Sequence, residues 1–276
     1  MKNFDDYINS YLSRYIFEQN EPETTDKYKL GIFIGKFKPP HRGHFNTLAG
    51  ILGEGENVFS TRYPQDIPDC ICNEAVVVVS NKPVISGENG KELPAKSISD
   101  LKKQGMSTED IARQLGAGMI FTDELAKNIW DLFITTSSIA GKAEVRIDHP
   151  VSGAISLLEN IKNTGSYKGI PIDRLNIRLF VGEEEGDDNE IDVKETENQM
   201  KRYSYILKNQ REILGTDDEE PVKVCVMGRS TSATVVREKI LRVSIEGSDI
   251  QTLQENIPEH VDVSAFWDLA SQAVIR

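Results

Sequence analysis

The sequence predicts an α/β fold in which a mostly parallel β-sheet is covered by helices on both faces. Residues 30–34 and 74–80 are short apolar runs, typical of parallel strands that are buried on both sides. After the first run, and after a further apolar run at 222–227, turn residues lead directly into a helical pattern. Sheets of this kind bind ligands at the carboxyl ends of their strands, so we expect functional residues directly after these runs.

The chain has 276 residues, enough to bury a sizeable core, and divides into two parts. Apolar residues recur at helical spacing from Phe4 to Ile16, and a polar stretch follows. Residues 1–27 are therefore predicted to be an N-terminal helix and linker. We expect this helix to pack outside the sheet or against a second subunit, in which case the protein is a homo-oligomer. Residues 28–276 are predicted to form one domain.

The composition argues against several classes of protein. No apolar stretch has the length of a membrane span and the N-terminus lacks the pattern of a signal peptide, so we expect a cytoplasmic protein without membrane contact. The net charge of −12 makes a nucleic-acid partner unfavourable. Cys70, Cys72 and Cys225 are too few for a disulfide scaffold and lack zinc-binding spacing, so we predict reduced thiols and no protein-bound metal.

The most informative stretch is residues 35–44, Gly-Lys-Phe-Lys-Pro-Pro-His-Arg-Gly-His. Gly35 permits a tight turn, the two prolines delay the helix, and apolar residues recur at helical spacing from about residue 41. His41 and His44 are three apart, which places both imidazoles on one side of the first turn. The unpaired N–H groups of that helix end favour an anion. Three cations complete a predicted phosphate cradle: Lys36, Lys38 and Arg42.

The strand at 74–80 ends in Ser80, Asn81 and Lys82, which are candidates for the binding pocket or for ordinary turn residues. A helical insertion is predicted at 86–118, where Ser107 and Asp110 indicate a helix start. This stretch also resembles half of a helix-turn-helix unit that binds DNA. Its acidic residues would be unfavourable in a polyanionic groove, so we interpret the insertion as a cover over an acceptor pocket.

The remaining elements follow from local patterns. Trp130 lies one residue off the apolar stripe of a predicted helix at 122–133, so it either stacks on a substrate base or packs in the core. The acidic stretch at 183–198 has no apolar period and is predicted to be a solvated loop. The other assignments are a loop at 56–73, strands at 143–147 and 175–181, a helix beginning near 154 and a helix at 203–214.

A second candidate phosphate site follows the strand at 222–227. Ser232 and Thr234 place hydroxyl groups at a predicted helix N-terminus, and Arg237 lies one turn later. Hydroxyls at a helix start and a guanidinium beside them can clamp a phosphate, although helix-capping residues alone look the same. This candidate site and the one at residues 35–44 both follow directly after a predicted strand, and this shared position supports reading them as parts of one phosphate site.

These residues resemble a known superfamily. Residues 35–44 are similar to the G-x-F-x-P-x-H-x-G-H signature of the nucleotidylyltransferases, and closest in appearance to nicotinamide-mononucleotide (NMN) adenylyltransferases. Ser232, Thr234 and Arg237 resemble the distal S-x-T-x-x-R motif of the superfamily. The resemblance extends over about residues 28–269 and implies a Rossmann-like fold. In such proteins an acidic residue follows the fourth strand, and the run Gly-Glu-Glu-Glu-Gly-Asp-Asp from residue 182 leaves open which carboxylate corresponds to it.

The resemblance implies transfer of AMP from ATP to a phosphate monoester, most specifically to NMN to give NAD, with release of pyrophosphate. His41 and His44 would hold the α- and β-phosphates, supported by Lys36 or Arg42. Ser232, Thr234 and Arg237 would hold the β- and γ-phosphates. The remaining signature residues assigned to nucleotide binding are Gly35, Phe37 and Gly43. Mg²⁺ would be bound largely by the nucleotide and by water.

Two alternatives remain at this stage. A cytidylyltransferase could use the same scaffold, although its signature more often has the shorter form G-x-F-D-x-x-H-x-G-H. A nucleotide-sensing or DNA-binding regulator could retain a degraded site, but both motifs are intact here. The sequence therefore favours an adenylyltransferase acting on small-molecule substrates.

Overall fold

The structure is a computed structural model that describes residues 27–61, 66–182, 198, 200–217, 220–228 and 233–275. The predicted N-terminal helix, nearly all of the acidic stretch at 183–198, and Ser232 lie outside these residues.

A five-stranded sheet forms the centre of the molecule, and every neighbouring pair of its strands is parallel. The chain runs outward from β1 (Tyr28–Gly35) to β2 (Glu74–Ser80) and β5 (Ala143–Asp148) on one side, and to β8 (Leu175–Gly182) and β9 (Val222–Met227) on the other. This confirms the predicted Rossmann-like α/β fold and places the carboxyl end of β1 where the strand order reverses. The order of the strands across the sheet is β5, β2, β1, β8 and β9.

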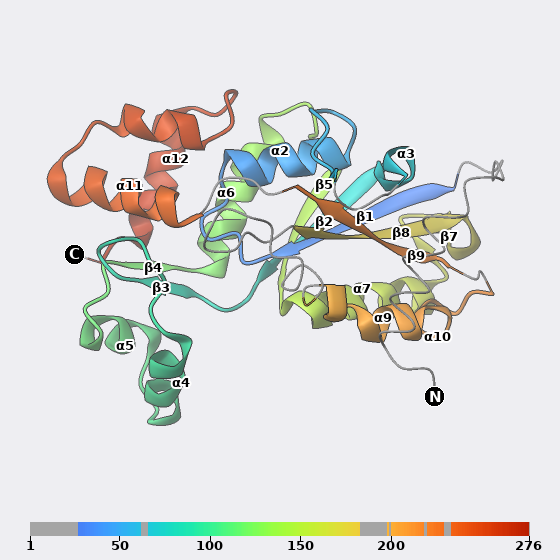
Figure 1. The fold of residues 1–276 in the computed structure, drawn as a ribbon, viewed down its shortest axis with the longest axis horizontal. Coiled ribbons are helices and arrows are strands. Elements are labelled where there is room, and N and C mark those ends of the chain that lie inside the picture. The colour runs from blue at the N-terminus through green and yellow to red at the C-terminus, as the bar shows by residue number, and fades with distance from the viewer. Residues whose placement is uncertain are drawn as a thin grey trace.

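Helices cover both faces of the sheet (Figure 1). Alternate residues of the central strands are apolar and contribute to separate cores on the two faces. Phe33 and Val77 point into a core shared with α2 (Arg42–Ile51), α6 (Asp123–Thr135) and α12 (Val263–Ala270). Ile32 and Val76 point into a second core on the opposite face. That core contains α7 (Pro150–Thr164), α9 (Ser204–Lys208) and α10 (Gln210–Leu214).

The helix predicted at 203–214 is two short helices rather than one, because the backbone of Asn209 leaves helical geometry between α9 and α10. The predicted loop at 56–73 contains a short helix that the sequence pattern did not indicate. The remaining elements are α3 (Ile67–Cys70), β6 (Ser166–Tyr167), β7 (Ile170–Pro171), α11 (Ala233–Glu246) and the 3₁₀ segments Ile172–Arg174, Ile250–Asn256 and Ser271–Ala273.

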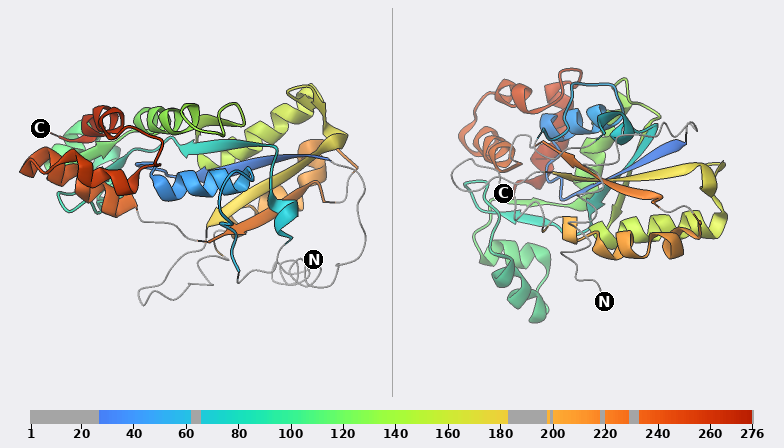
Figure 2. Two further views of the ribbon diagram at one scale, coloured as in Figure 1. Left: turned by 90° about the horizontal axis from the view of Figure 1, so that it is seen from above. Right: turned by 45° about the vertical axis from the view of Figure 1, so that its right-hand side comes forward.

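The predicted insertion at 86–118 contains two helices, α4 (Ala95–Lys103) and α5 (Thr108–Gln114), with Ser107 capping α5 as expected. The sequence did not predict the antiparallel pair β3 (Val84–Ser86) and β4 (Met119–Phe121) that carries them. Ile85, Ile111 and Ala112 form a small core of their own. Figures 1 and 2 show α4 and α5 extending from this pair, away from the five-stranded sheet.

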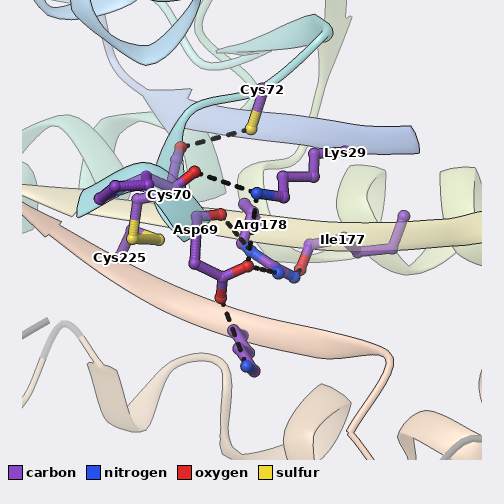
Figure 3. Close-up of a disulfide and its surroundings, with 9 residues drawn as sticks. Lys29, Asp69, Cys70, Cys72, Ile177, Arg178 and Cys225 are labelled. Atoms are coloured by element: carbon purple, nitrogen blue, oxygen red, sulfur yellow. Dashed lines mark hydrogen bonds and ion pairs between the residues drawn. A yellow bond between two sulfur atoms is a disulfide. The ribbon is translucent and has the colours of Figure 1, made fainter. Parts of the chain in front are cut away.

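The cysteine prediction was wrong. Cys70, at the end of α3, forms a disulfide with Cys225 of β9, although the two are 155 residues apart in the sequence (Figure 3). Cys72 is a free thiol, and burial raises its pKa to about 12. The spacing of the cysteines gave no indication of this pair, because the two residues meet only where the fold brings α3 beside β9.

We expect reduction of the disulfide to destabilise the protein. A bond that closes so long a loop restricts the unfolded chain, and loss of such a bond typically costs about 2–5 kcal/mol. Urea unfolding with and without dithiothreitol measures the change. Cys72→Ser should keep the dependence on reductant, whereas Cys70→Ser together with Cys225→Ser should abolish it. Identical unfolding of the wild type in both conditions would restore the prediction of reduced thiols.

Candidate active site

The carboxyl end of β1 is shaped by a close contact between Gly35 and Phe37. A Cβ atom on residue 35 would lie 2.7 Å from two ring carbons of Phe37, so only glycine fits beneath the ring. Phe37 itself has φ of 48°, in the left-handed region that non-glycine residues rarely adopt. Its ring packs against Phe33, Trp130 and His44 at centroid distances of 4.8, 5.4 and 5.0 Å. The turn thereby brings the chain back over the strand end.

His41 and His44 stack on one another at the start of α2, as their spacing predicted, with ring centroids 3.7 Å apart. His41 is only 1% exposed, and His44 is half-buried. Among the described residues, neither ring nitrogen of His41 has a hydrogen-bond partner, and Nδ1 of His44 has none. Buried polar atoms in proteins are nearly always paired, so this pair is a candidate for ligand binding.

Both imidazoles are neutral near pH 7. Burial lowers the pKa of His41 to about 4, and the charge of Arg237 acts in the same direction. Burial, and then the neighbouring His41, hold the pKa of His44 well below its usual range. A neutral imidazole donates one hydrogen bond through its N–H group. The pair can therefore donate to phosphate oxygens without first being protonated.

The depressed pKa of His41 predicts an acid-sensitive fold. The unfolded state binds a proton near pH 6.5 and the folded state only near 4, so stability is fully present above 6.5 and is lost as the pH falls between these values. A shift of this size corresponds to about 3 kcal/mol. Urea unfolding of the wild type and of His41→Asn at pH 7 and pH 4.5 isolates this contribution from that of the carboxylates. An equal loss of stability in both proteins would contradict the prediction.

Arg237 of α11 joins the distal motif to the histidine segment. Its side chain is buried, and its Nη1 donates to the carbonyl oxygen of Lys38 at 2.7 Å. Its Nε donates to the carbonyl oxygen of Gly90 at 2.7 Å, and its Nη2 to Oγ1 of Thr234 at 3.1 Å. Glu92 lies 3.8 Å from Nη2 and partly balances the charge. The two predicted motifs, far apart in sequence, are thus in direct contact.

The other predicted residues differ in how closely they approach this centre. Lys36 is exposed and forms an ion pair with Glu92 at 2.8 Å, and Arg42 forms one with Glu259 at 2.7 Å. Gly43 is buried within α2, where its carbonyl oxygen accepts from the Thr47 hydroxyl. Lys36 and Arg42 are therefore both paired at the surface, and their support of the histidines stays a prediction.

The four predicted pocket residues have different surroundings. Ser80 is buried at the end of β2, whereas Asn81 and Lys82 are exposed. Trp130 is fully buried on α6, and its ring meets Phe37 edge-on at 5.4 Å. The Trp130 ring therefore packs in the core, and its contact with a substrate base stays a prediction. Its indole Nε1 nevertheless has no hydrogen-bond partner within the described part of the chain.

Lys38 is one of the three cations that the sequence placed in the phosphate cradle, and its ammonium group instead contacts the loop after β2. It is 1% exposed, and its ammonium donates to the carbonyl oxygens of Ser80 and Lys82. Burial lowers its pKa to about 8, opposed chiefly by the charge of Asp123. A lysine in a polar turn is normally exposed, so no local signal could have indicated its burial.

Comparisons with known proteins add the following. No protein-family model matches the chain, and no curated protein matches it. Its structural neighbours include proteins named as nicotinate-nucleotide or nicotinic acid mononucleotide adenylyltransferases. A candidate nicotinate-nucleotide adenylyltransferase from Vibrio parahaemolyticus is 15% identical, with a TM-score of 0.37, covering 87% of this chain and 98% of the other.

The nicotinic acid mononucleotide adenylyltransferase of Plasmodium falciparum was solved with APC and with NaAD. Both structures are 12% identical to this chain and cover 88% of it and 97% of their own, with TM-scores of 0.41 and 0.39. None of the helices in the described ranges has the length and apolar composition to cross a membrane.

Proposed function

We propose that the protein is a nucleotidylyltransferase that transfers AMP from ATP to a phosphate-monoester acceptor and releases pyrophosphate. The observation that carries the proposal is the stacked pair of His41 and His44. Both rings are neutral and lie at the N-terminus of a ten-residue helix, with His41 buried and His44 half-buried. Among the described residues, both ring nitrogens of His41 and Nδ1 of His44 have no hydrogen-bond partner. Such a helix end attracts phosphate, and Arg237 supplies a fixed positive charge nearby.

In the proposed reaction, an oxygen of the acceptor phosphate attacks the α-phosphorus of ATP. The new P–O bond forms as the bond to the β-phosphate oxygen breaks, and pyrophosphate leaves with that electron pair. Negative charge accumulates on the bridging and leaving oxygens. Imidazole N–H donors that are already in place stabilise this charge without reorganising, which is the main source of catalysis in such sites. Arg237, Thr234 and Ser232 would hold the departing phosphates.

Mg²⁺ is expected to enter with the nucleotide. The described residues contain no cluster of three or more His, Cys, Asp or Glu side chains that could hold a metal ion. A Mg²⁺ ion bound by triphosphate oxygens and water fits a site whose protein groups are imidazoles and cations. Bound in this way, the ion would neutralise charge on the triphosphate.

For the acceptor we propose NMN, which would make the product NAD. The signature run Lys36-Phe37-Lys38 followed by two prolines is closer to NMN adenylyltransferases than to cytidylyltransferases. To test this choice, the protein is incubated with ATP or CTP and with one of three acceptors: NMN, nicotinic acid mononucleotide or choline phosphate. The rate of pyrophosphate release is measured for each combination. We expect the fastest release with ATP and NMN. Preference for CTP would favour the cytidylyltransferase, and no release from any pair would contradict both.

The alternative of a DNA-binding regulator predicts a different result. The first turn of α5 carries Glu109 and Asp110, and Arg113 lies 3.8 Å from Asp110, so the helix presents mixed charge. A protein that binds DNA gains most of its affinity from cations that replace counterions on the phosphates. We therefore expect fluorescence anisotropy at low salt to detect no sequence-specific binding. Tight binding to one defined duplex, with a scrambled duplex as control, would support the regulator instead.

A further inference from the structure

Lys38 connects the histidine segment to the loop that follows β2. Strands β1 and β2 pair in parallel up to Gly35 and Val79, and their chains then separate into different loops. The Lys38 side chain crosses between them, because its ammonium donates to the carbonyl oxygens of Ser80 and Lys82. The contact with the Ser80 carbonyl is buried and the contact with the Lys82 carbonyl is partly buried. A buried carbonyl group without a donor is costly, so the contact at Ser80 in particular holds the second loop in place.

The backbone of Lys38 makes a separate connection to the distal motif. Its carbonyl oxygen accepts from Nη1 of Arg237, and Arg237 in turn reaches the carbonyl oxygen of Gly90. Lys38 therefore contacts one side of the site through its side chain and the other through its main chain. Its charge is faced by Asp123 at the start of α6, by Lys36 and by Glu92.

We propose that Lys38 is a positioning residue that holds the loop at Ser80 and Lys82 against the histidine pair, and thereby sets the acceptor site. The inference rests on the proposed function, in which the histidines bind the nucleotide, and on the sequence expectation that residues 80–82 border the acceptor. Lys38 touches no reacting atom in this account. It acts by fixing two carbonyl groups, and so the distance between the acceptor and the α-phosphorus, to which transfer reactions are sensitive.

This arrangement predicts a selective effect of side-chain removal. Lys38→Met removes both donors to the loop but keeps the main-chain carbonyl that receives Arg237. We expect the KM for the acceptor to rise about tenfold or more and kcat to fall, whereas the KM for ATP and the ATP-induced rise in Tm stay unchanged. Lys38→Arg, which keeps the charge and the donors, should recover part of the loss. Lys91→Met, which removes an exposed lysine of the same region, should behave as the wild type.

The binding of NMN and of ATP, measured by calorimetry for all four proteins, separates this inference from the proposed function. Selective loss of NMN binding in Lys38→Met supports the inference even if no pyrophosphate is released, in which case the proposed function alone fails. Equal weakening of both ligands, or unchanged binding of both, would overturn the role of Lys38. Failure of the wild type to bind either ligand would overturn both proposals. If Lys38→Met does not fold, the comparison rests on Lys38→Arg. Should Lys38→Arg then bind both ligands as the wild type does, Lys38 has a structural role only and the inference is overturned.

Discussion

Replacing His44 with alanine is expected to lower turnover about a hundredfold or more, the scale of losing one preorganised donor to a developing charge. The imidazole stacks on His41 at 3.7 Å, and its Nδ1 has no hydrogen-bond partner among the described residues, so its removal takes away little that the fold requires. Steady-state release of pyrophosphate gives the turnover, and far-UV circular dichroism checks the fold.

His149→Ala is the matched control, because His149 is an exposed histidine at the start of α7. Its turnover should equal that of the wild type. If His44→Ala also turns over at nearly the wild-type rate, His44 is not in the site. His44→Gln, which can still donate a hydrogen bond, should retain more activity than His44→Ala.

Arg237→Ala is expected to remove the stabilisation by ATP and also to destabilise the protein without nucleotide. Arg237 is 2% exposed and donates to Lys38, Gly90 and Thr234, so alanine leaves buried carbonyl groups without donors. Hydrogen bonds to a charged group contribute about 1.5–3 kcal/mol each, and the combined loss should exceed that of a surface arginine several-fold. The melting temperature with and without ATP and Mg²⁺ separates the two effects.

The control for this experiment is Arg242→Ala on the same helix. Arg242 is exposed and pairs with Glu238 at 2.6 Å, an arrangement that contributes at most about 1 kcal/mol. Its ATP-induced shift should match that of the wild type. Arg237→Lys should recover only part of the ATP effect, because lysine keeps the charge but not the planar group. An undiminished ATP-induced shift in Arg237→Ala would mean that the distal motif does not clamp the nucleotide.

The features that the sequence predicted depend on residues close together in the chain. The buried strand β1, the turn after it and the pairing of His41 with His44 all fall within a short segment whose periodicity is readable. The parallel sheet followed from the apolar runs and the helical patterns between them, because strand and helix periods differ.

The features that it missed depend on contacts between distant residues. Cys70 and Cys225 are 155 residues apart, and Lys38 and Arg237 are 199 apart. The strands β3 and β4 are three residues each, too short for an alternating pattern to be recognised. The sequence placed Lys38 in the phosphate cradle but missed its burial, because that burial depends on carbonyl groups of the loop that follows the neighbouring strand.

Nucleotidylyl transfer at the histidine pair can be measured by following the α-phosphate of ATP. The protein is incubated with Mg²⁺, NMN and ATP labelled with ³²P at the α-position, and the products are separated by chromatography. We expect the label to enter a dinucleotide in an amount equal to that of the unlabelled pyrophosphate released. In His44→Ala, formation of the labelled dinucleotide and release of pyrophosphate should fall together. Label that stays in ATP, or appears only in AMP or ADP while the wild type binds both substrates, would contradict the proposed transfer.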